Sequence, residues 1–329
     1  MPEGHSVHRI ARQFARNIVG RTVAASSPQG RFVEGAEVID GREALEVQAV
    51  AKQMFLRFDR DVWLRVHLGM YGAWDFSGDV SVDATIASSN GRMGQTNQRG
   101  TVIDDAILDA AGENSLSSIG APRRARVRMS EQTTGLDEQT EWPPPVVGAV
   151  RLRLLTESTC ADLRGPTACA LQTPDEIAAV IAKLGPDPLV DDVAEGEERF
   201  TATVKKKPTA IGLLLMDQAV VSGIGNVYRA ELLFRARQNP HTPGRDVPED
   251  VVRGIWRDWA RLLPIGVETG QMMTMDDLDP AAYRRAMAHR DDRHWVYHRA
   301  GLPCRVCGTT VLMEEAAGRK LYWCPSCQA

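Results

Sequence analysis

The sequence lacks long apolar runs, and this absence limits the kind of protein it encodes. No hydrophobic stretch approaches the roughly 18 residues of a membrane span, and the opening residues MPEGHSVHRI lack the apolar stretch of a secretory signal. We therefore expect a cytoplasmic protein without a membrane partner. Aromatic residues make up only 6%, and no repeat of fixed period occurs. The 43% hydrophobic and 25% charged residues exclude collagen, coiled-coil rods and wholesale disorder.

The chain also lacks an excess of positive charge, which argues at first against a nucleic-acid partner. Its 39 basic and 43 acidic residues give a net charge of −4. The charges are unevenly placed: residues 1–76 carry 10 basic and 9 acidic side chains, residues 77–198 carry 10 and 20, and residues 199–329 carry 19 and 14. Because the acidic residues lie in the middle of the chain, the net charge does not exclude a polyanion-binding surface built from its two ends. The charge pattern alone does not predict such a surface.

The 329 residues suffice for about two domains and a small extra module. Apolar residues recur at helical spacing between Glu3 and Gly20, which predicts an amphipathic first helix. Residues 44–74 read as a short β-meander, and AVRLRLL at residues 149–155 predicts a further strand. In the second half, helices are expected over residues 174–184, 210–219, 227–236, 248–266 and 279–290.

The stretch from about Gly78 to Val146 shows neither helical nor strand periodicity. It is dominated by Gly, Ser, Thr, Gln, Asn and Pro, as in SSNGRMGQTNQRG and EQTTGLDEQTEWPPP. We interpret it as a largely unordered insertion that splits one sheet, entering and leaving it at a hairpin. A neutral surface loop is favoured over a regulatory linker.

Four of the six cysteines form two CxxC pairs, CRVC and CPSC, separated by sixteen residues. These four are Cys304, Cys307, Cys324 and Cys327. The spacing predicts one zinc ion, because each CxxC knuckle presents two sulfurs to a tetrahedral metal. Two disulfides are the alternative, which a chain without a secretory signal disfavours. Four protein ligands leave no open coordination position, so the zinc is expected to be structural.

Between the two CxxC pairs, the segment VLMEEAAGRKLYW predicts two strands joined by a turn near Ala317 and Gly318. Arg319 and Lys320 then lie close to the tip of this hairpin. A charged tip is commonly a solvated turn, and on a zinc hairpin a phosphate contact is the competing interpretation.

Pro2 becomes a secondary amine once the initiator methionine is removed, as is usual before a small residue. An α-amino group has an ordinary pKa of about 7.7–8.0, and the positive end of a following helix opposes its protonation further. Attack of this amine on a sugar C1′ gives an iminium that eases base loss and β-elimination of phosphate. Glu3 stands beside it to protonate the base or the ring oxygen. A Pro-Glu start is also simply a common beginning of a helix.

Three motifs occur in the order found in one known family: MPEGHSVHR, then SGIGNVYRAELLF, then the paired CxxC ending in CPSCQ. On these motifs the chain resembles the formamidopyrimidine-DNA glycosylase/endonuclease VIII family of oxidised-base repair enzymes, over nearly its whole length outside residues 78–146. The resemblance implies an α+β fold: an N-terminal helix plus a two-layered β-sandwich (1–165), a helix-two-turn-helix domain (166–295) and a C-terminal zinc-finger hairpin (296–329). DNA binds between the halves in this family.

The resemblance also implies roles for five residues. Pro2 is similar to the Schiff-base nucleophile and Glu3 to the proton donor. Lys52, in the strand segment AVAKQMF, resembles the lysine that assists at the lesion's phosphate and in β-elimination, although a strand lysine usually faces solvent. Asn226, in GIGN, resembles the asparagine that holds a backbone phosphate. Arg319 resembles the finger arginine that grips the phosphate and acts in δ-elimination.

HLGMYG, at residues 67–72, matches the loop with which the family fills the gap left by a flipped base. Met70 is the candidate filler and Tyr71 its helper, with core packing as the alternative for Met70. The run of lysines at residues 205–207 either adds phosphate attraction or forms a solvated face.

Two departures from the family pattern bear on the substrate. Ser6 stands where many relatives carry a further acidic residue, and TCADLRGPTAC shows no Arg-Phe wedge. With the PEG start, the chain looks closer to endonuclease VIII-like members, particularly the actinobacterial type. By analogy, oxidised pyrimidines such as thymine glycol are favoured over 8-oxoguanine.

The sequence therefore predicts a bifunctional DNA glycosylase and abasic-site lyase of base excision repair, which cleaves by β- or β,δ-elimination. Its expected partner is damaged duplex DNA, with single-stranded DNA as a further substrate, and we expect a nucleoid-associated monomer. A zinc-dependent damaged-DNA-binding protein without catalysis is the alternative. A tautomerase with an N-terminal proline base explains Pro2 but neither the zinc finger nor the GIGN turn.

Overall fold

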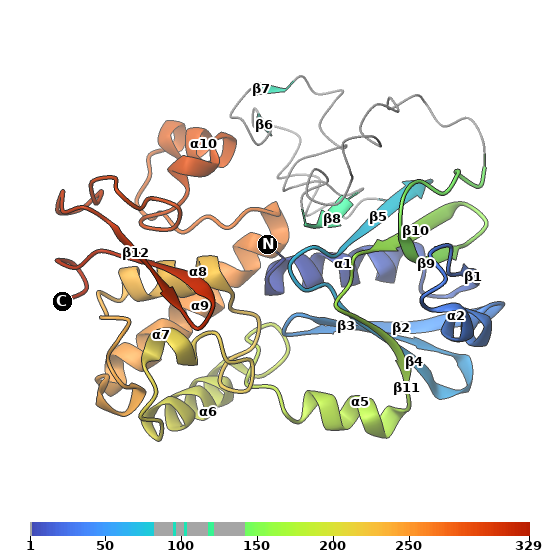
Figure 1. Cartoon of the computed structure of the whole chain (residues 1–329), viewed down its shortest axis with the longest axis horizontal. Helices are drawn as coiled ribbons and strands as arrows, with labels where there is room; N and C mark the ends of the chain where they lie inside the picture. Colours follow the sequence, from blue (N-terminus) through green and yellow to red (C-terminus); the bar gives the residue numbers. More distant parts are fainter. Residues whose placement is uncertain (1, 82–94, 97–101, 104–117, 122–141) are drawn as a thin grey trace. The chain divides into compact units, whose positions relative to one another are not determined.

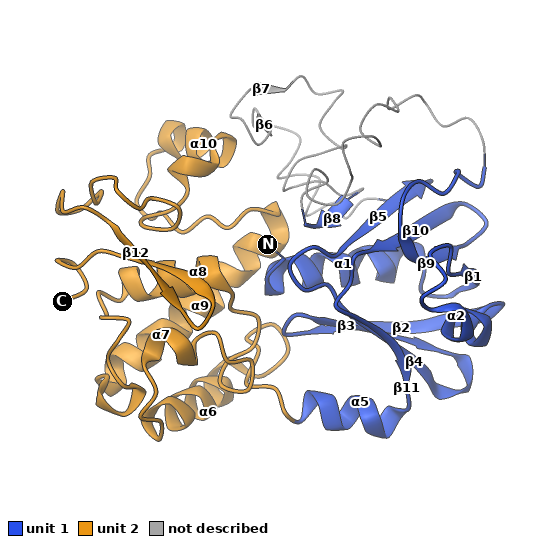
Figure 2. Ribbon diagram, in the orientation of Figure 1, with its two compact units in different colours: residues 1–92, 103–182 blue, residues 93–102, 183–329 orange. Residues whose placement is uncertain are grey.

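The structure is a computed structural model that describes residues 2–81, 95–96, 102–103, 118–121 and 142–329 (Figure 1). Most of the predicted insertion at residues 78–146 lies outside the described residues. The chain divides into two compact units, which are coloured separately in Figure 2. Unit 1 comprises residues 1–92 and 103–182, and unit 2 comprises residues 93–102 and 183–329.

Unit 1 combines an N-terminal helix with antiparallel strands (Figure 1). Its helical elements are α1 (Gly4–Asn17), α2 (Val33–Ile39), η1 (Asp59–Asp61) and α5 (Pro174–Ile181). The strands of its sheet are β1 (Arg21–Ser26), β2 (Arg42–Val50), β3 (Gln53–Phe58), β4 (Val62–His67), β5 (Ala73–Gly78), β8 (Ser118–Gly120), β9 (Val150–Leu155), β10 (Thr159–Arg164) and β11 (Ala168–Gln172). Two short strands, β6 (Gln95–Thr96) and β7 (Val102–Ile103), pair with each other.

Strand β1 joins the two layers of the predicted β-sandwich. The strand order is β11-β4-β3-β2-β1-β9-β10-β5-β8. The first half of β1 pairs with β2 and its second half pairs with β9, so the ladder changes layer within one strand. Helix α1 contributes Phe14 to the core, where its ring meets the edge of Trp74 at a centroid distance of 4.8 Å. The predicted first helix and two-layered sandwich are confirmed.

The predicted hairpin at the insertion is wrong. The chain leaves the sheet at the end of β5 and returns as β9, and β10 lies between these two strands. A tight turn at residues 156–158 folds β10 back onto β9, where it occupies the edge that β5 would need. Residues 118–120 add β8 to the other edge of β5.

Unit 2 is a helical bundle followed by a two-stranded hairpin. Its elements are α6 (Val193–Lys205), α7 (Ile211–Leu214), α8 (Asn226–Arg235), η4 (Gly244–Asp246), α9 (Glu249–Thr269), α10 (Pro280–Ala288), η5 (Arg290–Asp292), β12 (Leu312–Ala316) and β13 (Arg319–Trp323). Its core contains Trp259, whose ring meets the edge of Tyr228 at 4.6 Å. Among the described helices, none has the length and apolar character needed to cross a bilayer.

Two helices of unit 2 differ from the sequence prediction. The helix expected at residues 210–219 is only the single turn α7, because the Asp217 carboxylate accepts a hydrogen bond from the Ala219 N–H at 2.9 Å and so forms a turn instead. Helix α6 was not predicted. Its sequence signal is Asp192, whose carboxylate caps the helix by accepting from the N–H groups of Ala194 and Glu195.

Glu231 of α8 fixes the segment that leads into the C-terminal hairpin. Its carboxylate accepts hydrogen bonds from the backbone N–H groups of Trp295, Val296 and Tyr297 at 2.7–2.9 Å, and from the Thr274 hydroxyl at 2.5 Å. The side chain is fully buried, and burial raises its pKa against the opposing effect of these four hydrogen bonds. One carboxylate thus satisfies three consecutive backbone donors.

We expect Glu231→Gln to lower the free energy of unfolding by about 1–3 kcal/mol, because an amide NH2 group then faces donors that need an acceptor. Urea denaturation followed by circular dichroism measures the change. Glu195→Gln, at an exposed position of α6, is the control, with an expected change within about 0.5 kcal/mol. Equal changes in the two variants would contradict the role assigned to Glu231.

Candidate functional site

Pro2 and Glu3 lie at the amino end of α1 in unit 1. Pro2 is buried, and Glu3 has extended backbone angles immediately before the first helical residue. The Glu3 side chain is only 1% exposed and makes no capping hydrogen bond to the helix. The positive end of a 14-residue helix therefore lies beside the predicted nucleophile and proton donor.

A polar row on α1 is a feature that the sequence analysis missed. His5, Arg9, Gln13 and Asn17 are all buried, and their spacing of four residues places them on one face of the helix. Burial, with a contribution from Arg12, lowers the pKa of Arg9 to about 10. The signal was present in the sequence as polar residues at a strict i, i+4 interval beside the apolar stripe.

Lys52 lies in the turn between β2 and β3, and the prediction that places it within a strand is wrong at this point. Val50 pairs with Gln53, which leaves Ala51, at φ +59°, and Lys52 as a two-residue turn. A turn places the lysine at the end of the sheet. His67 ends β4 there, opposite Gln53, and its pKa is lowered by burial and then by the charge of Lys52. His67 is a further polar group of this region to which the sequence analysis gave no role.

Met70 and Tyr71 are presented to solvent by the loop that joins β4 to β5. Their exposed fractions are 41% and 59%, so the alternative that Met70 packs in the core is wrong. Gly69 has φ +64°, and a Cβ at this position would lie 1.8 Å from the Thr167 hydroxyl oxygen. Glycine is therefore required for the loop to take this path.

Asn226 connects the start of α8 to the C-terminal hairpin of unit 2. Its Nδ2 donates a hydrogen bond to the carbonyl oxygen of Lys320 at 2.7 Å. Nη2 of Arg229 donates to the same carbonyl at 3.0 Å and to Oδ1 of Asn226. The sequence analysis missed Arg229, although it lies one helical turn after Asn226 and so on the same face.

The C-terminal hairpin has the predicted turn. Ala316 of β12 pairs with Arg319 of β13, which leaves Ala317 and Gly318 between the strands at φ +50° and +71°. Arg319 is half-buried and Lys320 is exposed next to this turn.

Lys205, the first residue of the lysine run, is engaged within unit 2. Its Nζ donates hydrogen bonds to the carbonyl oxygens of Arg245 and Val247 at 2.6 and 2.5 Å. These contacts hold the end of α6 against the loop before α9.

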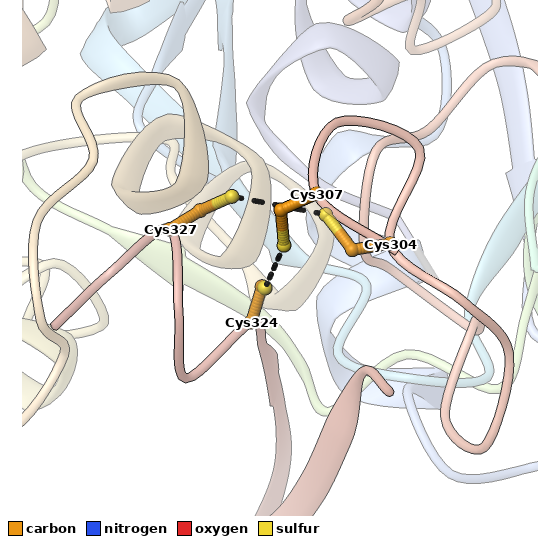
Figure 3. A group of neighbouring side chains, drawn as sticks. All are labelled: Cys304, Cys307, Cys324 and Cys327. Carbon is orange, nitrogen blue, oxygen red and sulfur yellow. Dashed lines mark hydrogen bonds between the residues drawn. The ribbon is translucent and has the colours of Figure 1, made fainter. Parts of the chain in front are cut away.

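The four predicted metal ligands form one cluster (Figure 3). Their sulfur atoms all lie within 4.8 Å of one another, and the sulfurs of Cys304 and Cys327 are 3.9 Å apart. A tetrahedral zinc ion with Zn–S bonds of about 2.3 Å requires sulfur separations of about 3.8 Å. None of the described cysteines is in a disulfide. Hydrogen bonds from Thr309 lower the pKa of Cys307 to about 6, whereas burial raises the pKa of Cys324 and of Cys327. The donor set therefore fits zinc.

The other two cysteines lie outside the cluster. Cys160 is buried and Cys169 is half-buried against the core of unit 1, and burial raises the pKa of each thiol to about 12.

Gln328 attaches the second CxxC knuckle to the helical part of unit 2. Its Oε1 accepts a hydrogen bond from the Cys324 N–H at 2.8 Å, and its Nε2 donates to the carbonyl oxygen of Gln238 at 3.1 Å. The side chain is fully buried. The metal cluster is thus fixed to the chain that follows α8.

Three family models match the chain in the order of these parts. They are the formamidopyrimidine-DNA glycosylase N-terminal domain over residues 1–165, the formamidopyrimidine-DNA glycosylase H2TH domain over residues 184–277, and the zinc finger found in FPG and IleRS over residues 301–329. The chain belongs to the formamidopyrimidine-DNA glycosylase family. This glycosylase is 33% identical to the Mycobacterium tuberculosis protein named Endonuclease 8 1 over 328 residues, which is 100% of both chains. The predicted family is confirmed.

Solved structures of other glycosylases share the fold. The crystal structure of the Thermus thermophilus Fpg protein has a TM-score of 0.64 and 23% identity, and covers 99% of this chain and 98% of its own. The Lactococcus lactis Fpg in complex with abasic-site DNA has a TM-score of 0.67 and 18% identity, with 99% of each chain covered. The solved structures show the shared fold, and family membership makes this glycosylase a DNA-repair enzyme with the predicted zinc-finger module.

We expect Cys324→Ala to reduce the zinc retained by this glycosylase at least about tenfold after dialysis against a chelator, because three thiolates bind zinc more weakly than four. Atomic emission on the purified protein measures the metal. Cys169→Ala, outside the cluster, should retain as much zinc as the unmodified chain. Retention of zinc by Cys324→Ala would contradict the assigned ligand set.

Proposed function

We propose that this glycosylase removes oxidised bases from DNA and cleaves the resulting abasic site through a Schiff base on Pro2. The observation that supports this most is the arrangement at the amino end of α1. There Pro2 adjoins a Glu3 side chain that is buried and is not used to cap the helix. A secondary amine at the positive end of a helix keeps a low proton affinity.

The chemistry proceeds in two stages. The Pro2 nitrogen attacks C1′, the bond from C1′ to the base breaks, and Glu3 delivers a proton to the leaving base or to the ring oxygen. Opening of the sugar gives an iminium between Pro2 and C1′. Loss of a C2′ proton then supplies the electron pair that expels the 3′-phosphate, with Lys52 assisting at the phosphate. Arg319 holds the phosphate and acts if a second, δ-elimination follows.

Three residues are assigned to hold the DNA. Asn226 and Arg319 contact backbone phosphate, and Met70 enters the gap left by the extruded nucleotide, a role to which its exposure is suited. One zinc ion on Cys304, Cys307, Cys324 and Cys327 keeps the Arg319 hairpin folded. The closed set of four thiolates leaves the metal without a chemical role. The Lactococcus lactis relative, whose fold is shared, was crystallised with abasic-site DNA.

We expect Pro2→Gly to weaken borohydride trapping on abasic-site DNA by at least about tenfold, because the secondary amine that forms a permanently charged iminium is replaced by a primary amine with more conformational freedom. Gel electrophoresis of the reduced enzyme–DNA adduct measures the effect. Pro28→Gly, in an exposed turn, is the control and should be trapped like the unmodified chain. An undiminished adduct with Pro2→Gly would exclude Pro2 as the nucleophile.

The favoured substrates are oxidised pyrimidines in duplex DNA. The similarity to Endonuclease 8 1 and the crystallisation of the Lactococcus lactis Fpg with DNA that contains an oxidised pyrimidine support this choice. A nicking assay with matched duplexes and single strands should show thymine glycol cleaved at least about tenfold faster than 8-oxoguanine, a difference of about 1.4 kcal/mol in transition-state binding. The gel also separates β- from δ-elimination products. Faster cleavage of 8-oxoguanine would contradict the assignment.

A damage-binding protein without catalysis is the second candidate. Tight binding of abasic-site DNA without strand cleavage, by protein whose initiator methionine has been removed, would support it.

The proposal further includes action as a monomer on nucleoid DNA in the cytoplasm. Sedimentation of the protein with and without a lesion duplex measures the stoichiometry.

A further inference from the structure

His298 occupies an unusual position in unit 2. Its backbone has φ +59°, a left-handed conformation that a residue with a Cβ seldom adopts. The imidazole stacks on Tyr297 with 4.4 Å between ring centroids and 15° between planes, and lies 5.6 Å from the Tyr322 ring. Both tyrosines are buried, whereas His298 is exposed. The two tyrosine rings thus form a shelf that holds one imidazole at the surface.

The shelf is itself rigidly held. The Tyr297 N–H donates to the buried Glu231 carboxylate at 2.8 Å. The Tyr297 and Tyr322 rings meet edge to face at 5.2 Å. Tyr322 belongs to β13, the strand whose Lys320 carbonyl oxygen is bound by Asn226 and Arg229. His298 is therefore fixed relative to the residues that are expected to meet the DNA backbone.

The charges around His298 are mainly positive. Lys320 lies two residues before Tyr322 in β13, so both side chains are on the same face of the hairpin. Arg290 of η5 supplies the second positive charge and Asp291 a single negative one. Partial burial lowers the pKa of His298 from its usual value, and Arg290 and Lys320 lower it further, with Asp291 opposing them. Burial raises the pKa of Tyr322 above its ordinary value of about 10, so this ring adds no charge near pH 7. An exposed imidazole under the influence of two cations is suited to bind an anion.

We propose that His298, together with Lys320 and Arg290, forms a phosphate-binding position in which the imidazole takes up a proton when the DNA backbone arrives. This inference rests on the proposed DNA-binding function and adds a residue to it. The phosphate charge reverses the local field, so the imidazole that the cations kept neutral becomes an imidazolium donating a charge-assisted hydrogen bond to a phosphate oxygen.

The sign of the pH effect follows from the two protonation states. Below the lowered pKa of the free protein the imidazole is already charged, and DNA affinity is at its full value. Above the raised pKa of the complex it is neutral in both states, and its contribution is lost. DNA affinity therefore falls as pH rises between these two pKa values, an interval that includes the ordinary histidine value of about 6.5.

The test is the dissociation constant of the full chain for a duplex that contains a tetrahydrofuran abasic analogue, which this chemistry cannot cleave. Fluorescence anisotropy at constant ionic strength measures it between about pH 6 and about pH 8.5. We expect His298→Gly, which suits the left-handed backbone, to bind about tenfold more weakly than the unmodified chain at the lower pH and within about twofold at the higher pH. His298→Lys, which carries a permanent charge, should restore tight binding at the higher pH.

His241→Asn is the matched control. His241 packs on Trp323 of the same hairpin, and its Nε2 lies 3.1 Å from the Glu314 carboxylate, so a charge there is already balanced. This variant should keep the pH dependence of the unmodified chain. A uniform loss of affinity in His298→Gly at every pH would overturn the inference in favour of a purely structural stack. Failure of the unmodified chain to bind the duplex would instead refute the proposed function.

Discussion

The geometry of the C-terminal part of this glycosylase depends on hydrogen bonds from one buried helix, α8. At its start Asn226 and Arg229 bind the carbonyl oxygen of Lys320. One turn later Glu231 binds three consecutive backbone N–H groups before the zinc finger. A two-stranded hairpin is marginally stable alone, so these bonds and the metal cluster together give the Arg319 turn a fixed place. The helix thus acts as a template on which the zinc finger is positioned.

Unit 1 uses α1 in a comparable way. Its apolar stripe packs in one core with residues from both sheet layers, and its polar row of His5, Arg9, Gln13 and Asn17 is also buried. Burial of a guanidinium such as that of Arg9 opposes folding unless its hydrogen-bonding groups are satisfied. A helix with two different buried faces can place both against their partners in only one rotational setting about its own axis. That setting fixes the direction of its amino end, and hence the place of Pro2 and Glu3.

The sequence predicts what depends on neighbouring residues and misses what depends on distant ones. The helix expected at residues 174–184 is present as α5, and its start has a local signal because Thr173 and Glu176 form a capping box. The hairpin turn at Ala317 and Gly318 and the four cysteines are likewise local. The hydrogen bond from Asn226 to Lys320 joins residues 94 positions apart, and no periodic pattern in the sequence predicts it. The position of β10 between β5 and β9 is also a result of strand pairing across the whole sheet. Lys52 was placed in a strand because its neighbours are apolar, whereas the register of β2 with β3 decides where the turn falls.

Net charge is a poor guide to DNA binding in this chain because many of its charges are balanced locally. Arg253 pairs with Glu197, Glu198 and Glu249, and Arg257 pairs with Glu197. These ion pairs remove acidic and basic groups alike from the field that an approaching polyanion meets. The charge that the polyanion meets is therefore set by where the other charged side chains lie on the surface. Burial lowers the pKa of His298, and Arg290 and Lys320 lower it further against the effect of Asp291, although the whole chain carries a net charge of −4. A surface of this kind attracts phosphate at short range, within the screening length of about 8–10 Å, where the distribution of charge and not its sum determines the interaction.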